Sequence, residues 1–142
     1  MTAPIDTARV RPAIERDRDA VLALLQPFVD DRHILPLRRQ ELDELLPTSF
    51  IAEIDDRVIG FGALDIYSRK LAEIRSLVVA DDCQGQGVGR RLVEACVALA
   101  RERDVMEILA ISSSESFFRS CGFDFTLPDE KKAFFLPIRT RQ

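Results

Sequence analysis

The sequence has 142 residues, of which 46% are hydrophobic and 31% charged, with a formal net charge of −4. This length and composition predict a single globular domain over residues 1–142 with room for a substantial core. The negative charge gives general nucleic-acid binding no electrostatic support, and no apolar run reaches the roughly 18 residues that indicate a membrane span.

The first third of the chain predicts a strand and two helices. Residues 8–13 read as a short extended piece, and Asp17 is the expected N-cap of an amphipathic helix that follows. A loop containing His33 then leads to a second helix over residues 37–46.

Three strands are predicted next. Residues 49–54 and 58–64 form a hairpin around a polar turn, and residues 71–79 form the central strand. Alternation along the central strand divides its side chains into two faces. One face is expected to hold Glu73, Arg75, Leu77 and Val79, and the other Ile74, Ser76 and Val78.

A glycine-rich loop follows the central strand and opens an amphipathic helix that runs to about residue 103. Gly85, Gly87 and Gly89 alternate there, so no β-carbon shields the nearby backbone amides. The first amides of a helix have no intrahelical acceptor, and the helix dipole adds partial positive charge. With Arg90 and Arg91 adjacent, this loop is typical of a phosphate site, although a plain glycine-rich turn is an alternative.

The rest of the chain predicts a buried strand over residues 105–111, a short helix over 115–121 and two final strands over 123–125 and 133–138. Five aromatic residues are expected in the core: Phe117, Phe123, Phe125, Phe134 and Phe135.

The cysteines and the single histidine indicate neither a metal site nor a disulfide framework. Cys83, Cys96 and Cys121 are odd in number and lack metal-ligand or redox spacing, and His33 stands alone. Residues 1–6 show no signal-peptide pattern. We therefore expect a protein without metal, in a reducing cytoplasm.

The glycine loop matches neither common nucleotide motif, but it resembles a third. The position after Gly89 breaks the Rossmann pattern, and no Gly-Lys-Ser/Thr of a P-loop is present. Gln84-Gly85-Gln86-Gly87-Val88-Gly89 matches Gln/Arg-x-x-Gly-x-Gly/Ala, the pyrophosphate loop of the GCN5-related N-acetyltransferase (GNAT) superfamily, and residues 116–123 resemble its aromatic-Tyr-x-x-x-Gly-Phe landmark. Residues 34–36, 72–79 and 117–119 are most similar to the acetyltransferase domain of N-acetylglutamate synthases.

The resemblance implies a fold and a cosubstrate. The fold would be a twisted, mixed and mostly antiparallel α/β (α+β) sheet of about six to seven strands, with helices on both faces and a cleft where strand 71–79 splays from strand 105–111. The cosubstrate would be acetyl-CoA, with its pantetheine on the central strand and its pyrophosphate on the loop. The residues expected to bind it are Leu77, Val78, Val79, Gln84, Gly85, Gln86, Gly87, Val88, Gly89, Arg90 and Phe118.

The resemblance also implies direct acetyl transfer to an amine in a ternary complex. Glu73 is the expected general base, or else a partner of Arg75 or a lysine, and the Val79 amide is the expected oxyanion donor. Phe118 replaces the tyrosine that protonates the thiolate in the family. Cys121, Ser114, Ser116, a water or, less well, Tyr67 would act instead, or the thiolate leaves unassisted.

The acceptor is expected to be a small amine, with a glutamate-like amino acid favoured because arginine binds carboxylates bidentately. The residues expected to contact it are Arg75, Arg38, Arg39, His33 and Tyr67. Polyamines, other amines and peptide N-termini are alternatives, and so is an acyl-CoA-binding sensor without turnover. A homodimer is possible.

Overall fold

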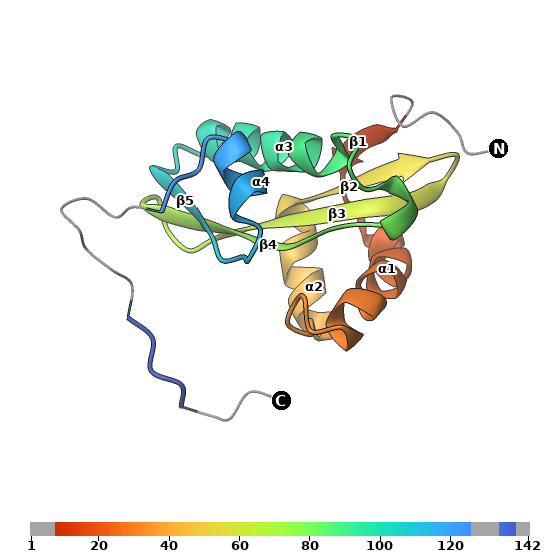
Figure 1. The fold of residues 1–142 in the computed structure, drawn as a ribbon, viewed down its shortest axis with the longest axis horizontal. Helices are drawn as coiled ribbons and strands as arrows, with labels where there is room; N and C mark the ends of the chain where they lie inside the picture. The colour runs from red at the N-terminus through yellow and green to blue at the C-terminus, as the bar shows by residue number, and fades with distance from the viewer. Residues whose placement is uncertain (1–7, 126–133, 139–142) are drawn as a thin grey trace. The chain divides into compact units, whose positions relative to one another are not determined.

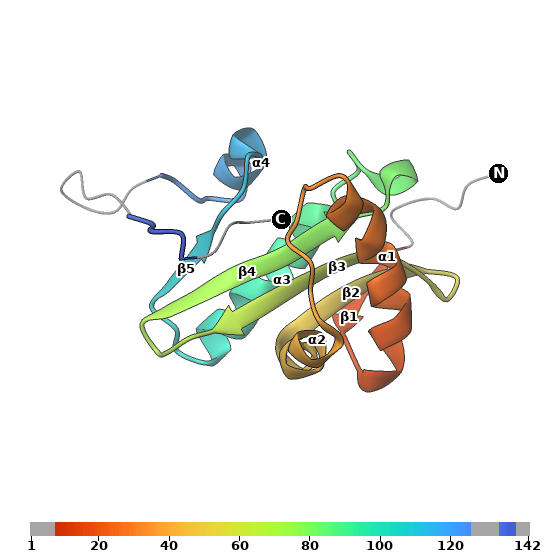
Figure 2. The same ribbon diagram turned by 90° about the horizontal axis from the view of Figure 1, so that it is seen from below.

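Five strands form one sheet, with helices packed on both of its faces (Figures 1 and 2). The computed structural model describes residues 8–125 and 134–138. The chain divides into two compact units, residues 1–112 and 113–142. The sheet belongs to the first unit, and the second contributes one short helix within its described part. None of the helices in the described ranges has the length and apolar character needed to cross a membrane.

The elements of the first unit follow the predicted order closely. Its strands are β1 (Arg9–Pro12), β2 (Ser49–Ile54), β3 (Arg57–Ile66), β4 (Leu71–Val79) and β5 (Glu107–Ala110). Its helices are α1 (Arg18–Asp30), α2 (Arg39–Leu45) and α3 (Val88–Glu102). Short 3-10 turns cover Glu15–Asp17, Leu46–Thr48 and Asp81–Cys83. The second unit holds α4 (Glu115–Ser120).

The sheet is mixed and mostly antiparallel, as predicted. Its strands lie in chain order, β1 to β4 pair antiparallel, and β5 pairs parallel to β4. The predicted count of six to seven strands is wrong for the described residues, which hold five. Residues 123–125 and 134–138 lie outside any strand, and Ala133 is not among the described residues.

The aromatic residues near the C-terminus do not all enter the core. Phe125, Phe134 and Phe135 are 71%, 92% and 69% exposed, so the prediction that they are buried is wrong. Apolar and aromatic residues favour a strand only where they can pair with a neighbouring strand and pack against other side chains. Residues 123–125 and 134–138 have no paired strand in the described structure.

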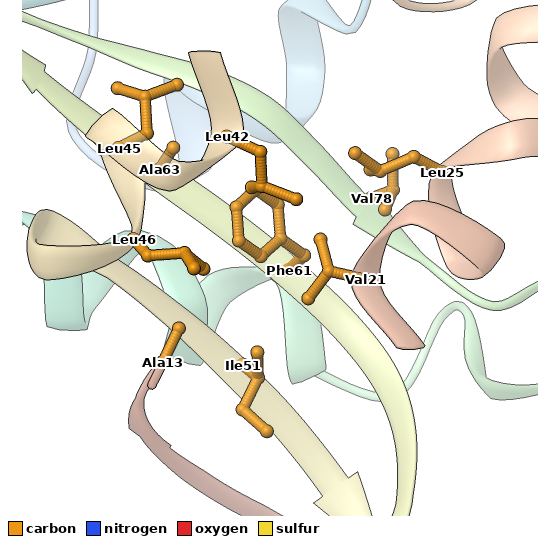
Figure 3. Packing of buried hydrophobic residues seen from close by; sticks show 10 residues of the cluster. All are labelled: Ala13, Val21, Leu25, Leu42, Leu45, Leu46, Ile51, Phe61, Ala63 and Val78. Carbon is orange, nitrogen blue, oxygen red and sulfur yellow. The ribbon is translucent and has the colours of Figure 1, made fainter. Parts of the chain in front are cut away.

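The core lies in two layers, one on each face of the sheet. Phe61 is fully buried at the centre of the layer beneath α1 and α2 (Figure 3). The helices supply this layer with Val21, Leu25, Leu42 and Leu45, and the sheet with Ile51, Phe61, Ala63 and Val78. The layer beneath α3 includes Ala52, Ile59, Val88 and Leu92, with Leu77 and Val79 packed against it. The sheet therefore packs against helices on both faces.

A bulge in β4 changes which face its side chains occupy. Phe61 pairs with Val78 but Ala63 pairs with Arg75, so two residues of β4 oppose one of β3. Ser76 takes the left-handed conformation there, with φ 54°. The prediction that Glu73, Arg75, Leu77 and Val79 share one face of the strand is therefore wrong. Arg75 lies on the α2 side, where it contacts Glu41, and Leu77 packs on the α3 side.

Asp17 does not cap α1 as predicted. Its carboxylate accepts hydrogen bonds from the Ile14 amide at 2.8 Å and from both terminal nitrogens of Arg11 at 2.9 Å, and it makes no side-chain bond to the start of α1. Arg11 also bonds Glu53 on β2 at 3.0 Å. The hydrogen bond from Arg11 lowers the pKa of Asp17. These largely buried contacts tie β1 and β2 to the start of α1.

Candidate functional site

The candidate site begins where β4 loses its second neighbour. β5 pairs with β4 from Leu71 to Ile74, and no registered pair continues beyond Ile74 in the described part of the chain. The following residues of β4, from Arg75 to Val79, are paired with β3 alone. This is the divergence of the two strands that the family resemblance implies.

The backbone of Val79 faces this open edge. Ala80 donates its amide to the Ile59 carbonyl across the sheet at 2.7 Å. Because neighbouring peptides in an antiparallel pair point alternately toward and away from the partner strand, the amide and carbonyl of Val79 point away from β3. An N–H group at a free edge can bind a ligand as an added strand would.

The glycine loop presents the amides expected of an anion site. Gly85 and Gly87 have φ of 77° and 87°, and a Cβ on either would meet no atom within 4 Å. Gly87 caps α3, and the first α-helical bond of α3 runs from the Arg91 amide to the Gly87 carbonyl. The amides of the first three helical residues therefore have no acceptor four residues earlier in the helix.

The two arginines beside the loop have different surroundings. Arg91 donates through Nη1 to the Ala8 carbonyl at 2.8 Å, which fastens α3 to the segment before β1. Arg90 is about half exposed and pairs with Glu94 one turn later at 3.3 Å. Arg90 is thus the arginine that can turn toward a bound anion, because a surface pair between residues four apart is weak.

The turn between β4 and the loop is anchored on both sides. Gln84 donates through Nε2 to the Val79 carbonyl at 2.9 Å and to Asp81 at 3.2 Å. Arg57, the first residue of β3, donates through both terminal nitrogens to Asp82, each at 3.0 Å. No local sequence pattern predicts this ion pair, because it joins residues 25 apart in the chain.

A cluster of charged side chains lies on the α2 side of β4. Tyr67 donates its hydroxyl to Glu73, and Arg75 donates through Nη1 to Asp65 at 2.9 Å. Asp65 and Glu73 are register partners on β3 and β4. Glu73 is therefore held by Tyr67, and neither Arg75 nor a lysine is its partner in the described contacts.

The start of α2 completes this cluster. Glu41 lies 3.8 Å from Nη2 of Arg75 and accepts the Arg38 backbone amide at 3.3 Å. Burial opposes the charge on Arg75, but the bond to Asp65 and the attraction of Asp65, Tyr67 and Glu73 together outweigh it and raise the pKa of the guanidinium. Burial and the Glu73 carboxylate raise the pKa of Tyr67 well above its usual value, so this hydroxyl stays protonated.

In the described part of the chain, the side chains of the other predicted acceptor residues make no ion pair or hydrogen bond with Arg75, and only the backbone amide of Arg38 is linked to it, through Glu41. Arg38 and His33 are exposed, and Arg39 pairs with Asp19 on α1 at 3.1 Å. Glu41 and Asp65 were not among the site residues predicted from the sequence. The hairpin register could have placed Asp65 opposite Glu73, whereas the contact of Glu41 depends on how α2 packs.

Phe118 lies in the second unit, on α4. Its ring packs edge-on against Phe117 and Phe123, with centroids 5.1 and 5.4 Å away. Its contact with the coenzyme remains a prediction. Among the described residues, no group of three or more His, Cys, Asp or Glu side chains is arranged to hold a metal ion.

Comparison with known proteins identifies the family. The model of the acetyltransferase (GNAT) family matches residues 18–123. The chain is 32% identical over 114 residues to an uncharacterised N-acetyltransferase of Chlorobaculum tepidum, covering 80% of this chain and 74% of that protein. It is 27% identical over 119 residues to an amino-acid acetyltransferase of Mycobacterium tuberculosis, covering 80% and 68%.

A solved structure shows the same fold with coenzyme bound. N-acetylglutamate synthase from Neisseria gonorrhoeae, complexed with coenzyme A and N-acetyl-glutamate, superposes with a TM-score of 0.78 at 26% identity. The match covers 92% of this chain but only 31% of the synthase. The chain belongs to the acetyltransferase (GNAT) family and is an N-acetyltransferase that uses acetyl-CoA as its acetyl donor.

Proposed function

We propose that this enzyme acetylates the amino group of a small amino acid, glutamate or a close relative, by direct attack in a ternary complex. The observation that carries the proposal is that Glu73 and Arg75 lie on one face of β4, where its free edge begins. A carboxylate can take the ammonium end of an amino acid and a guanidinium its carboxylate. The similarity to amino-acid acetyltransferases supports the same substrate class.

Arg75 keeps hydrogen-bonding capacity for such an acceptor. A guanidinium has five N–H donors, and the close bond to Asp65 uses Nη1. Glu41, at 3.8 Å from Nη2, is beyond hydrogen-bond distance. Arg38 is exposed at the start of α2, two residues after Pro36, and is the second cation we assign to the acceptor carboxylate.

The residues at the other end of β4 fit acetyl-CoA. The amides at the start of α3 and the open space beside Gly85 and Gly87 suit a pyrophosphate. Arg90 supplies a full positive charge next to them, and the Val79 amide is directed to the edge along which the pantetheine would lie. When bound, acetyl-CoA supplies a thioester with an electrophilic carbonyl carbon and a thiolate that can leave.

The chain's own residues then have separate tasks. Glu73 removes a proton from the acceptor ammonium, directly or through water, so that a neutral amine attacks. The Tyr67 hydroxyl holds that carboxylate in place. The Val79 N–H donates to the carbonyl oxygen as negative charge develops on it. Holding both reactants in this geometry supplies much of the rate enhancement.

A second acceptor class is favoured by a specific observation. The carboxylates of Glu41, Asp65 and Glu73 outnumber the guanidinium of Arg75 in the cluster. A local excess of negative charge attracts cations. A polyamine or another acceptor with an additional positive charge is therefore the alternative to a glutamate-like amino acid.

An acceptor panel tests the proposal. Acetyl-CoA consumption is followed by thioester absorbance, because the cysteines would react with a thiol dye. The panel contains L-glutamate, the other amino acids, polyamines and short peptides. Turnover on glutamate or a relative, lost in Arg75→Gln, supports the proposal. Turnover on polyamines alone would refute the carboxylate-binding role of Arg75 and support the second class.

A further inference from the structure

The turn that precedes the glycine loop is held by a side chain from a distant hairpin. Arg57 follows the β2–β3 turn, and its two terminal nitrogens each lie 3.0 Å from a different carboxylate oxygen of Asp82. This two-point contact fixes the orientation of the carboxylate as well as its distance. Asp82 is the middle residue of the 3-10 turn Asp81–Cys83.

The glycine loop itself has few means of holding its conformation. Gly85 and Gly87 are free of contacts at the Cβ position and occupy φ values that most residues avoid. Glycine has the largest conformational freedom of any residue in the unbound chain. A loop that binds a ligand through backbone amides gains affinity when neighbouring contacts preorganise it. The neighbouring contacts here are the Gln84 bond to Val79 and the Arg57 pair with Asp82.

We propose that Arg57 is a positioning residue for acetyl-CoA, which holds Asp82 and thereby keeps the glycine loop ready to receive the pyrophosphate. The proposal rests on the assignment of that loop as the pyrophosphate site. The contact also neutralises a carboxylate beside the place where an anion would bind. The hydrogen bonds between the two side chains lower the pKa of Asp82 and raise the pKa of Arg57, as expected for a formed ion pair.

The test is a double-mutant cycle read by calorimetric binding of coenzyme A to the full chain. The variants are Arg57→Gln, Asp82→Asn and their combination. Because an exposed Arg–Asp pair stabilises weakly, each single variant is expected to raise the Kd about threefold to fivefold. The double variant should bind coenzyme A no more weakly than either single variant, because the same Arg57–Asp82 contact is lost in all three.

Three further measurements separate positioning from other effects. The kcat at saturating acetyl-CoA should be unchanged while its KM rises. Acetyl-pantetheine, which lacks the pyrophosphate, should show the same KM in Arg57→Gln as in the wild type. The matched control Arg18→Gln breaks a comparable ion pair with Asp43, at 3.0 and 3.1 Å between α1 and α2, and should leave the Kd unchanged.

Several outcomes would overturn the inference. If Asp82→Asn tightened binding while Arg57→Gln weakened it, charge repulsion alone would explain both results. An unchanged Kd in Arg57→Gln, or an equal loss with acetyl-pantetheine, would also refute positioning of the loop. If the wild type bound coenzyme A normally, these results would leave the proposed function intact. If the wild type failed to bind coenzyme A, the proposed coenzyme site would fall together with this inference.

Discussion

Ser76 offers a direct test of how the site is shaped, because its backbone conformation produces the bulge in β4. With φ 54° in the middle of a strand, an L-residue carries a penalty of about 1–2 kcal/mol relative to the right-handed conformations. Glycine avoids that penalty but costs about 0.5–1 kcal/mol through its greater freedom in the unfolded chain. Ser76→Gly should therefore stabilise the fold by up to about 1.5 kcal/mol.

A β-branched residue should have the opposite effect. Ser76→Val places a side chain that strongly disfavours positive φ at this position, and we expect a loss of about 1–3 kcal/mol. Urea unfolding at equilibrium, with matched m-values, measures both changes. If Ser76→Gly were clearly less stable than the wild type, or Ser76→Val equally stable, the bulge would not depend on a strained residue and the reasoning would be refuted.

Two other predictions concern the glycine loop and the Arg11 network. Gly87→Ala should weaken coenzyme A binding more than about tenfold, because a side chain enters the anion site and φ 87° is strained for alanine. Asparagine tolerates positive φ better than alanine, so Gly87→Asn should be more stable than Gly87→Ala but should bind coenzyme A no better. Recovered affinity for coenzyme A would argue against the site. The pKa of Asp17 is lowered in the fold by Arg11, so the pair stabilises the protein above the unfolded pKa of about 3.9, and this stability is lost as the pH falls through the folded value. The urea midpoint of Asp17→Asn should accordingly depend less on pH between about 2 and 5 than that of the wild type, and equal slopes would show that the pair contributes nothing.

The sequence predicted the elements whose signals are local. The strands β2, β3 and β4 and the helix α3 follow from apolar periodicity, and the glycine loop follows from residue types at fixed spacing. The bulge was missed because serine is not a residue that signals positive φ. That single residue moved Leu77 and Val79 to the opposite face from Arg75.

Contacts between distant parts of the chain could not be predicted in this way. Asp17 was expected to cap α1, but Arg11 and the Ile14 amide bind its carboxylate instead. Arg57 and Asp82 are joined only because the β2–β3 hairpin lies beside the turn after β4. The C-terminal segments had strand-like composition, yet composition supplies no partner strand.

The proposed chemistry depends most on Glu73, and one substitution tests its role directly. Glu73→Gln preserves the size of the side chain and its capacity to accept a hydrogen bond from Tyr67, but it removes the base. With the acceptor found in the panel, kcat should fall about 10²- to 10⁴-fold, while the Kd for coenzyme A stays at the wild-type value. An unchanged kcat would contradict the assignment of Glu73 as the group that takes the proton from the amine.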